Sequence, residues 1–119
     1  MDILFLLTLF FIKHWLIDFV WQTPAEIANK GTYLKWAGLV HSVKHGIGTF
    51  VILWITDISF EMLYFLSLAD IIIHYHIDWA KMNLSKDLTA ADHKFWVWLG
   101  FDQLLHHLTY VVFIDIMLI

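Results

Sequence analysis

Four long apolar segments make up most of this chain, and each of them contains a pair of ionisable residues. In every pair, a histidine or aspartate is followed four residues later by another. The pairs are His14/Asp18, His41/His45, His74/Asp78 and Asp102/His106. Because a spacing of four places two side chains on one face of a helix, each segment is predicted to be a helix with a polar pair on one face.

The composition predicts that these helices lie in a lipid bilayer. Of the 119 residues, 61% are hydrophobic, against roughly 45–50% in a soluble domain. The apolar segments cover residues 3–21, 33–55, 60–80 and 95–119. Each is long enough to cross a ~30 Å hydrocarbon layer at ~1.5 Å per residue. We therefore predict an all-α fold, a single transmembrane domain over residues 1–119 that forms an antiparallel four-helix bundle.

Lysine and tryptophan positions predict the orientation of this bundle. The lysines in or beside the first and third loops are Lys30, Lys35, Lys81, Lys86 and Lys94. Tryptophans near the same helix ends are Trp21, Trp36, Trp79, Trp96 and Trp98. Since cytoplasmic loops are rich in lysine and interfaces are rich in tryptophan, we expect a multi-pass protein of the bacterial inner membrane with both termini outside the cytoplasm.

Composition also excludes several classes of site and partner. The chain has no cysteine, so disulfides and thiolate zinc sites are excluded. Its formal net charge is −4, and without a basic cluster no nucleic-acid partner is expected. The expected partner is the lipid bilayer, and the sequence is also compatible with a homo-oligomer.

Counting along the helices predicts that the four pairs converge. At ~1.5 Å per residue, all eight side chains lie roughly 3–18 Å from the cytoplasmic helix ends. Ionisable residues in membrane segments are costly and usually functional. We therefore predict a metal centre whose candidate ligands are His14, Asp18, His41, His45, His74, Asp78, Asp102 and His106. For any single pair the alternative is a hydrogen bond between helices.

Five imidazoles and three carboxylates exceed the four ligands of a tetrahedral zinc ion, so one or two divalent ions fit. Zinc is our first choice because nothing in the sequence requires redox chemistry, and iron or manganese are alternatives. A zinc-bound water has a pKa near ~7. An aspartate that is not used as a ligand, from among Asp18, Asp78 and Asp102, would then act as general base.

Four further polar residues are expected to orient the ligands or contact a substrate: Gln22, Asp70, Lys81 and Gln103. Asp70 and Tyr110 continue the third and fourth polar stripes, so either is expected to line a polar path; alternatively, Asp70 is expected to pair with His74, one turn further along. Lys81 is expected to reach a substrate anion or to extend to lipid head groups. Lys13 and Lys44 fall inside predicted spans, where salt bridges to aspartates are expected.

At these residues the sequence resembles a family of small bacterial and phage integral membrane proteins, domain of unknown function 3307. The matching elements are His14-Trp-Leu-Ile-Asp18-Phe19-Val-Trp-Gln22, His41-Ser-Val-Lys-His45, His74-Tyr-His-Ile-Asp78 with Lys81, and Phe101-Asp102-Gln103-Leu-Leu-His106. The resemblance implies the same membrane architecture and the same polar positions. A looser likeness, of site type and not of motif, is to membrane-bound metal-dependent hydrolases.

Three functions fit the sequence. The leading hypothesis is a metal-dependent hydrolase that acts at the cytoplasmic leaflet on a phosphoester or a lipid head group. The second is a metal-ion or proton transporter or channel, which requires polar groups to continue to the outer face. The third is a non-catalytic membrane protein whose helices are held together by a structural metal or by hydrogen bonds.

Overall fold

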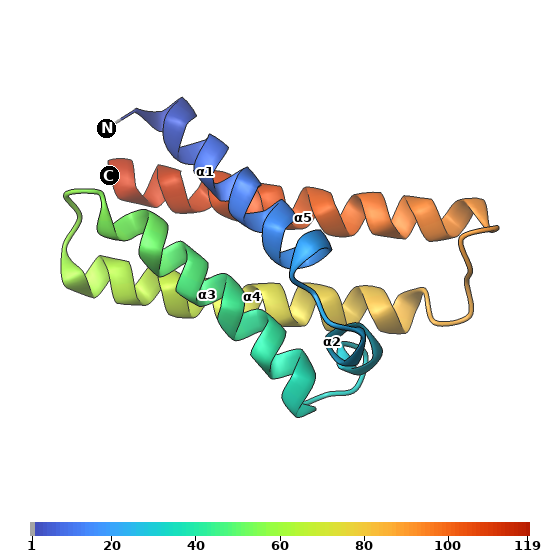
Figure 1. The fold of residues 1–119 in the computed structure, drawn as a ribbon. Helices are drawn as coiled ribbons and strands as arrows, with labels where there is room; N and C mark the ends of the chain where they lie inside the picture. Colours follow the sequence, from blue (N-terminus) through green and yellow to red (C-terminus); the bar gives the residue numbers. More distant parts are fainter. Residues whose placement is uncertain (1) are drawn as a thin grey trace.

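The protein is helical throughout residues 2–119, the part of the chain that the computed structural model describes. The helices are α1 (Ile3–Trp15), the π-helix η1 (Leu16–Val20), α2 (Pro24–Asn29), α3 (Trp36–Trp54), α4 (Phe60–Leu84) and α5 (His93–Leu118) (Figure 1). Within that range there is no β-strand, and the predicted all-α class is confirmed. The helix over 60–84 extends four residues beyond the predicted end at residue 80.

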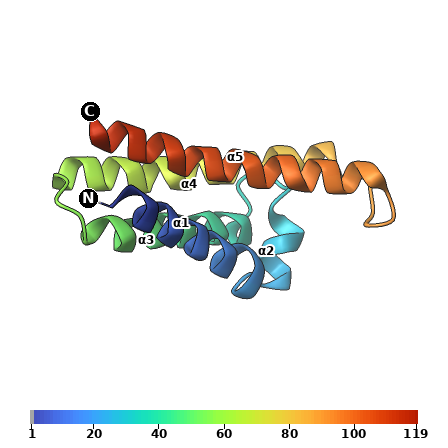
Figure 2. The same ribbon diagram turned by 90° about the horizontal axis from the view of Figure 1, so that it is seen from above.

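The four longer helices lie side by side in alternating directions (Figures 1 and 2). Helix α1 packs against α3 and α5, and α4 packs against the same two helices from the other side. Both termini lie at one end, beside the turn between α3 and α4, and the α4–α5 turn lies at the opposite end. The short helix α2 packs against α3.

Residues 23–26 determine where α2 begins. The Thr23 side chain accepts a hydrogen bond from the backbone N–H of Glu26, and the Glu26 carboxylate accepts one from the backbone N–H of Thr23. Pro24 occupies the first turn, where its missing N–H costs no helical hydrogen bond. This reciprocal cap, which the sequence pattern predicts, also places the Glu26 carboxylate beside α3.

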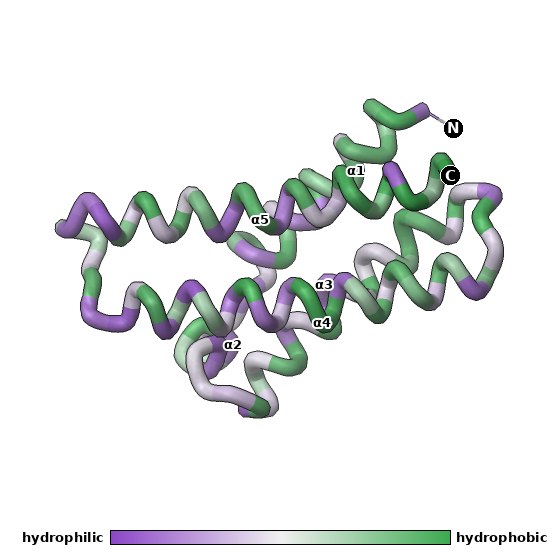
Figure 3. Tube along the Cα trace, turned by 180° about the vertical axis from the view of Figure 1, so that it is seen from behind, coloured by the Kyte–Doolittle hydropathy of each residue, from purple (hydrophilic) through white to green (hydrophobic). Residues whose placement is uncertain are grey.

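An apolar core fills the half of the structure nearer the termini. Its buried members come from all four long helices and include Phe10, Leu53, Leu66 and Phe113. Phe10 and Tyr110 stack with ring centroids 4.9 Å apart. Hydrophobic residues dominate near the termini, whereas hydrophilic ones interrupt the helices in the middle and gather at the α4–α5 turn (Figure 3). The apolar core and most of the polar residues therefore occupy different parts of the helix assembly.

The outer surface of the long helices is apolar. Large hydrophobic side chains that are at least half exposed include Leu4, Phe19, Ile47, Val51, Phe65, Leu68 and Val112. Among residues 2–119, the segments Ile3–Val20 and Phe60–Leu84 are long and apolar enough to cross a membrane.

Candidate metal centre

The eight histidines and aspartates of the four sequence pairs meet in one buried cluster. Helix α1 with η1 provides His14 and Asp18, α3 provides His41 and His45, α4 provides His74 and Asp78, and α5 provides Asp102 and His106. None of the eight is more than 5% exposed. We call this set the His/Asp cluster.

Asp18 is in contact with four imidazoles of the cluster. Its Oδ1 lies 2.9 Å from Nε2 of both His41 and His45, and 3.5 Å from Nε2 of His74. Its Oδ2 lies 3.1 Å from Nε2 of His14. The Asp18 carboxylate therefore joins side chains from α1, α3 and α4.

Asp78 joins a second set of groups. Its Oδ1 lies 3.2 Å from Nε2 of His106, and its Oδ2 lies 3.3 Å from Nε2 of His74 and 3.4 Å from Nε2 of His41. The Nζ of Lys30, which follows α2, lies 3.0 Å from the same Oδ2. This ion pair attaches the first loop to the cluster.

Asp102 and Gln103 complete the cluster on α5. Asp102 Oδ1 lies 3.3 Å from Nε2 of His106, and its Oδ2 accepts a hydrogen bond of 3.0 Å from the Gln103 amide. The Gln103 Oε1 lies 2.8 Å from Nε2 of His14, whose Nδ1 lies 3.1 Å from the Tyr110 hydroxyl. Gln103 therefore contacts both an imidazole and a carboxylate, the position expected of a residue that orients them.

Three subsets of these residues bring ligand atoms close enough together to hold a metal ion. They are Asp18, His41, His45 and His74; His14, His74 and His106; and Asp78, Asp102 and His106. In each subset, the ligand atoms lie within 4.8 Å of one another. His74 and His106 each belong to two subsets, so the sets adjoin.

The spacing of the donor atoms matches that of a shared cation. When ligand atoms lie ~2.0–2.1 Å from a metal, neighbours are about 3.3–3.4 Å apart in a tetrahedron and about 2.8–3.0 Å apart in an octahedron. The Nε2 atoms of His41 and His74 are 3.3 Å apart, and the Asp18 contacts of 2.9–3.5 Å cover the same interval.

Hydrogen bonding alone leaves a conflict between His41 and His74. Both Nε2 atoms face carboxylate oxygens, which when ionised can only accept hydrogen bonds. Both nitrogens would therefore carry protons, yet they also face each other. A divalent cation between them removes this conflict, because a metal takes the place of both protons.

The charges of the cluster also favour a cation. It contains three carboxylates, and of the lysines only Lys30 forms an ion pair with one of them. Buried carboxylates are stable only when they are well paired.

Glu26 and Lys30 were not predicted as parts of the site. Glu26 Oε1 lies 2.8 Å from Nζ of Lys44 and 3.5 Å from Nδ1 of His41, on the side of the imidazole away from Asp18. A carboxylate behind a metal-bound histidine is a common arrangement. Although burial raises the pKa of Glu26, hydrogen bonds from Lys44 and Thr23 lower it to about 2. The expected salt bridge of Lys44 is thus made with a glutamate and not with an aspartate.

Asp70 differs from its expected place. It accepts hydrogen bonds from Lys13 Nζ, at 2.7 Å, and from the Thr49 hydroxyl, and does not pair with His74. Lys13 also lies 4.5 Å from the centroid of the Tyr110 ring. The flexible ammonium of Lys13 reaches Asp70 across the structure and satisfies it more fully than a neutral imidazole would. The expected salt bridge between Lys13 and an aspartate is confirmed.

A polar cavity of about 70 Å³ adjoins the cluster on the side of α2. Its walls include all three cluster aspartates, together with Lys30, Lys81 and Gln22. The Gln22 amide donates a hydrogen bond of 2.7 Å to the backbone carbonyl of Asp18 and so supports the backbone beneath this carboxylate. Lys81, expected to meet an anion, forms no ion pair among the described residues but lines this cavity.

Asp18 lies in the π-helical segment η1, which the sequence does not predict. The backbone N–H of Trp21 donates to Leu16 O over 2.7 Å, a five-residue spacing typical of a π-helix. Such segments are rare and are frequent at functional sites. From this segment Asp18 contacts His41 and His45 of α3, whereas His14, one turn earlier, contacts α5.

The family described as "Protein of unknown function (DUF3307)" matches residues 6–119. Neither a curated protein nor a solved structure matches the chain.

Proposed function

The chain belongs to the DUF3307 family, and we propose that it is a membrane-embedded, metal-dependent hydrolase that acts on a phosphoester or a lipid head group at the cytoplasmic leaflet. One observation carries this proposal. Eight imidazole and carboxylate groups share one buried cluster, and this cluster borders a cavity lined by two lysines.

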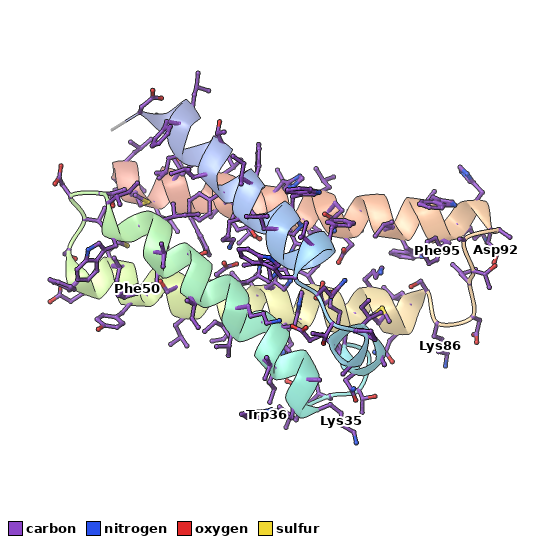
Figure 4. All side chains as sticks on the ribbon, in the orientation of Figure 1. Lys35, Trp36, Phe50, Lys86, Asp92 and Phe95 are labelled. Atoms are coloured by element: carbon purple, nitrogen blue, oxygen red, sulfur yellow. The ribbon has the colours of Figure 1, made fainter. Side chains whose placement is uncertain are left out.

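The proposed setting is an antiparallel four-helix bundle that spans the bacterial inner membrane. Its support is the apolar outer surface of the long helices and the two segments that are apolar enough to cross a bilayer. Lys86, at the α4–α5 turn, and Lys35, before α3, lie at the ends that we assign to the cytoplasm (Figure 4). Both termini would then lie outside.

We assign one ion to Asp18, His41, His45 and His74, and a second to Asp78 and His106, which leaves Asp102, the third member of that subset, without a metal. Zinc is the first choice, because imidazole and carboxylate ligands suit it and no cysteine is needed, while iron or manganese would accept the same donors. Such an ion would lower the pKa of a bound water to near ~7 and would polarise a phosphoryl oxygen.

The residues of the cavity suit an anionic ester. Lys30 and Lys81 line it and would attract the negative oxygens of a phosphate group. In hydrolysis, the oxygen of water forms a new bond to phosphorus as the ester P–O bond breaks. Of the three aspartates, Asp102 has the fewest partners in the cluster, with contacts only to His106 and Gln103. We therefore assign Asp102 to accept the proton of that water, which then passes to the leaving alcohol.

Transport is the second candidate, and one observation favours it. Lys13, Thr49 and Asp70 extend the polar network from the cluster toward the termini. Beyond them, however, the apolar core that contains Phe10 and Leu53 fills the space between the helices. Because this core would block ions or protons, hydrolysis accounts better for the structure.

Metal analysis and an activity assay test the proposal together. We expect protein purified without chelator to contain one or two equivalents of a divalent metal and to cleave a chromogenic phosphodiester. His45→Ala should abolish both, and the matched change His93→Ala, at an exposed histidine, should alter neither. Protein that neither contains nor is stabilised by zinc, manganese or iron would overturn the metal centre. Protein that contains metal but cleaves no phosphoester would overturn the hydrolase and indicate a non-catalytic metal site.

A further inference from the structure

An apolar groove runs along the outer surface between α4 and α5. It has a volume of about 460 Å³, and its walls include Ile73, Ile77, Ala80, Trp98 and Leu105. This volume lies within the range of ~300–1,000 Å³ that is typical of ligand sites. Ile73, at 39% exposure, shows that the groove is open to the surroundings at this residue.

The groove ends at the His/Asp cluster. Two residues, Lys81 and Asp102, line both the groove and the polar cavity. The apolar groove and a cavity that holds carboxylates and two lysines are therefore separated only by these two side chains. A ligand that occupies both must have a long apolar part and a negatively charged end.

The geometry points to a membrane phospholipid as the substrate, with one acyl chain in the α4/α5 groove and its phosphate between Lys81 and Lys30. This inference rests on the proposed hydrolase function and names its substrate class. Hydrocarbon would contact Ile73, Ile77 and Leu105, whose side chains have no polar group that an acyl chain would leave unpaired. The phosphate ester would then lie next to Asp102, the proposed proton acceptor.

A second groove provides a matched control. It lies between α1 and α3, is larger at about 610 Å³, and is lined by residues such as Ile47 and Val51. None of its lining residues borders the polar cavity. A lipid chain held there would not adjoin the polar cavity. Lipid binding in the two grooves can therefore be distinguished with variants in which a bulky side chain fills one groove or the other.

The experiment compares Ala80→Trp, which fills the α4/α5 groove, with Val51→Trp, which fills the control groove. Native mass spectrometry of the full chain in detergent would measure how much phosphatidic acid and how much diacylglycerol each variant retains. We expect Ala80→Trp to lower phosphatidic acid retention about tenfold, because an indole occupies the space of the chain. Val51→Trp should retain it as the wild type does, and Lys81→Gln should remove the preference over diacylglycerol.

Activity measurements on the same variants separate this inference from the proposed function. A water-soluble phosphodiester has no acyl chain to place in the α4/α5 groove, so Ala80→Trp should slow hydrolysis of phosphatidic acid and leave hydrolysis of the water-soluble ester unchanged. Equal behaviour of the two tryptophan variants, or equal retention of phosphatidic acid and diacylglycerol, would overturn the groove assignment alone. Failure of the wild type to cleave either ester would overturn the hydrolase and with it the substrate role, whatever the retention.

Discussion

Gly46 allows the closest approach of α3 and α4, and replacing it by alanine should destabilise the protein. A Cβ atom at this position would lie 2.6 Å from Ile71 Cδ1 and 2.9 Å from the backbone oxygen of Ser67. The Ile71 side chain can rotate, but the Ser67 oxygen belongs to α4 and cannot move alone. To restore an ordinary contact distance, α3 and α4 must separate by about 0.5 Å or more.

The size of the effect follows from two opposing terms. Alanine favours a helix over glycine by about 1 kcal/mol, whereas overpacking of a tight contact costs about 1–3 kcal/mol. The control is Gly100→Ala, because a Cβ at Gly100 meets no atom within 4 Å and only the favourable helix term applies. We expect Gly46→Ala to be less stable than Gly100→Ala by about 1–3 kcal/mol.

Unfolding by titration with sodium dodecyl sulfate, followed by circular dichroism, would measure this difference. A change at Gly46 should also weaken metal binding, because the preceding residue is His45 and the displaced helix α4 carries His74. Gly46→Ala protein as stable as Gly100→Ala, with unchanged metal affinity, would refute the claim that close packing of α3 on α4 positions the cluster.

Three further predictions concern the charged residues. Asp18→Asn should lower metal affinity by at least about tenfold, while Asp115→Asn should leave it unchanged, as measured by competition with a chromogenic chelator. Lys13→Met should cost about 3–5 kcal/mol because it leaves Asp70 buried without its cation, and Lys13→Met/Asp70→Leu should recover most of this loss in the same unfolding titration; a double variant as unstable as the single one would contradict the pairing. The pKa of Glu26 is lowered from 4.5 to about 2, so its ionised form should stabilise the fold above pH 4.5 and lose this effect as the pH falls toward 2; unfolding titrations of Glu26→Gln should lack this pH dependence.

The sequence was sufficient to predict which residues meet. The spacing of four in each pair fixes a helix face, and the position of all four pairs in the same half of the predicted spans brings them near one another, so the cluster could be predicted without coordinates. Asp18 and His74 meet because each belongs to a pair on an inward helix face and both pairs lie in the same half of the helices. The same reasoning predicted that Lys13 would pair with an aspartate, since an ammonium inside an apolar segment needs one.

What the sequence could not provide depends on how the helices are rotated and on the path of the first loop. Asp70 precedes His74 by one turn, but its partner was determined by the length of Lys13 on another helix. Glu26 reads as half of a helix cap, and only the packing of α2 against α3 places it beside His41. In the sequence, Lys30 is an ordinary loop lysine, and only the position of α2 brings it to Asp78.

The π-helical segment η1 affects the position of Asp18 in the cluster more than it affects the packing of the apolar core. A π-turn contains more residues than an α-turn, so deletion of one residue between Leu16 and Val20 would let the first helix continue as a regular α-helix. Because a π-turn closes with one residue more than an α-turn, the residues on the two sides of the deletion would keep nearly the same relative rotation. Such a shortened chain should still pack its apolar half, yet Asp18 would no longer lie in the widened turn beside His41 and His45. One extra residue at this position is thus a small genetic change by which a plain helix assembly could gain a carboxylate among its imidazoles.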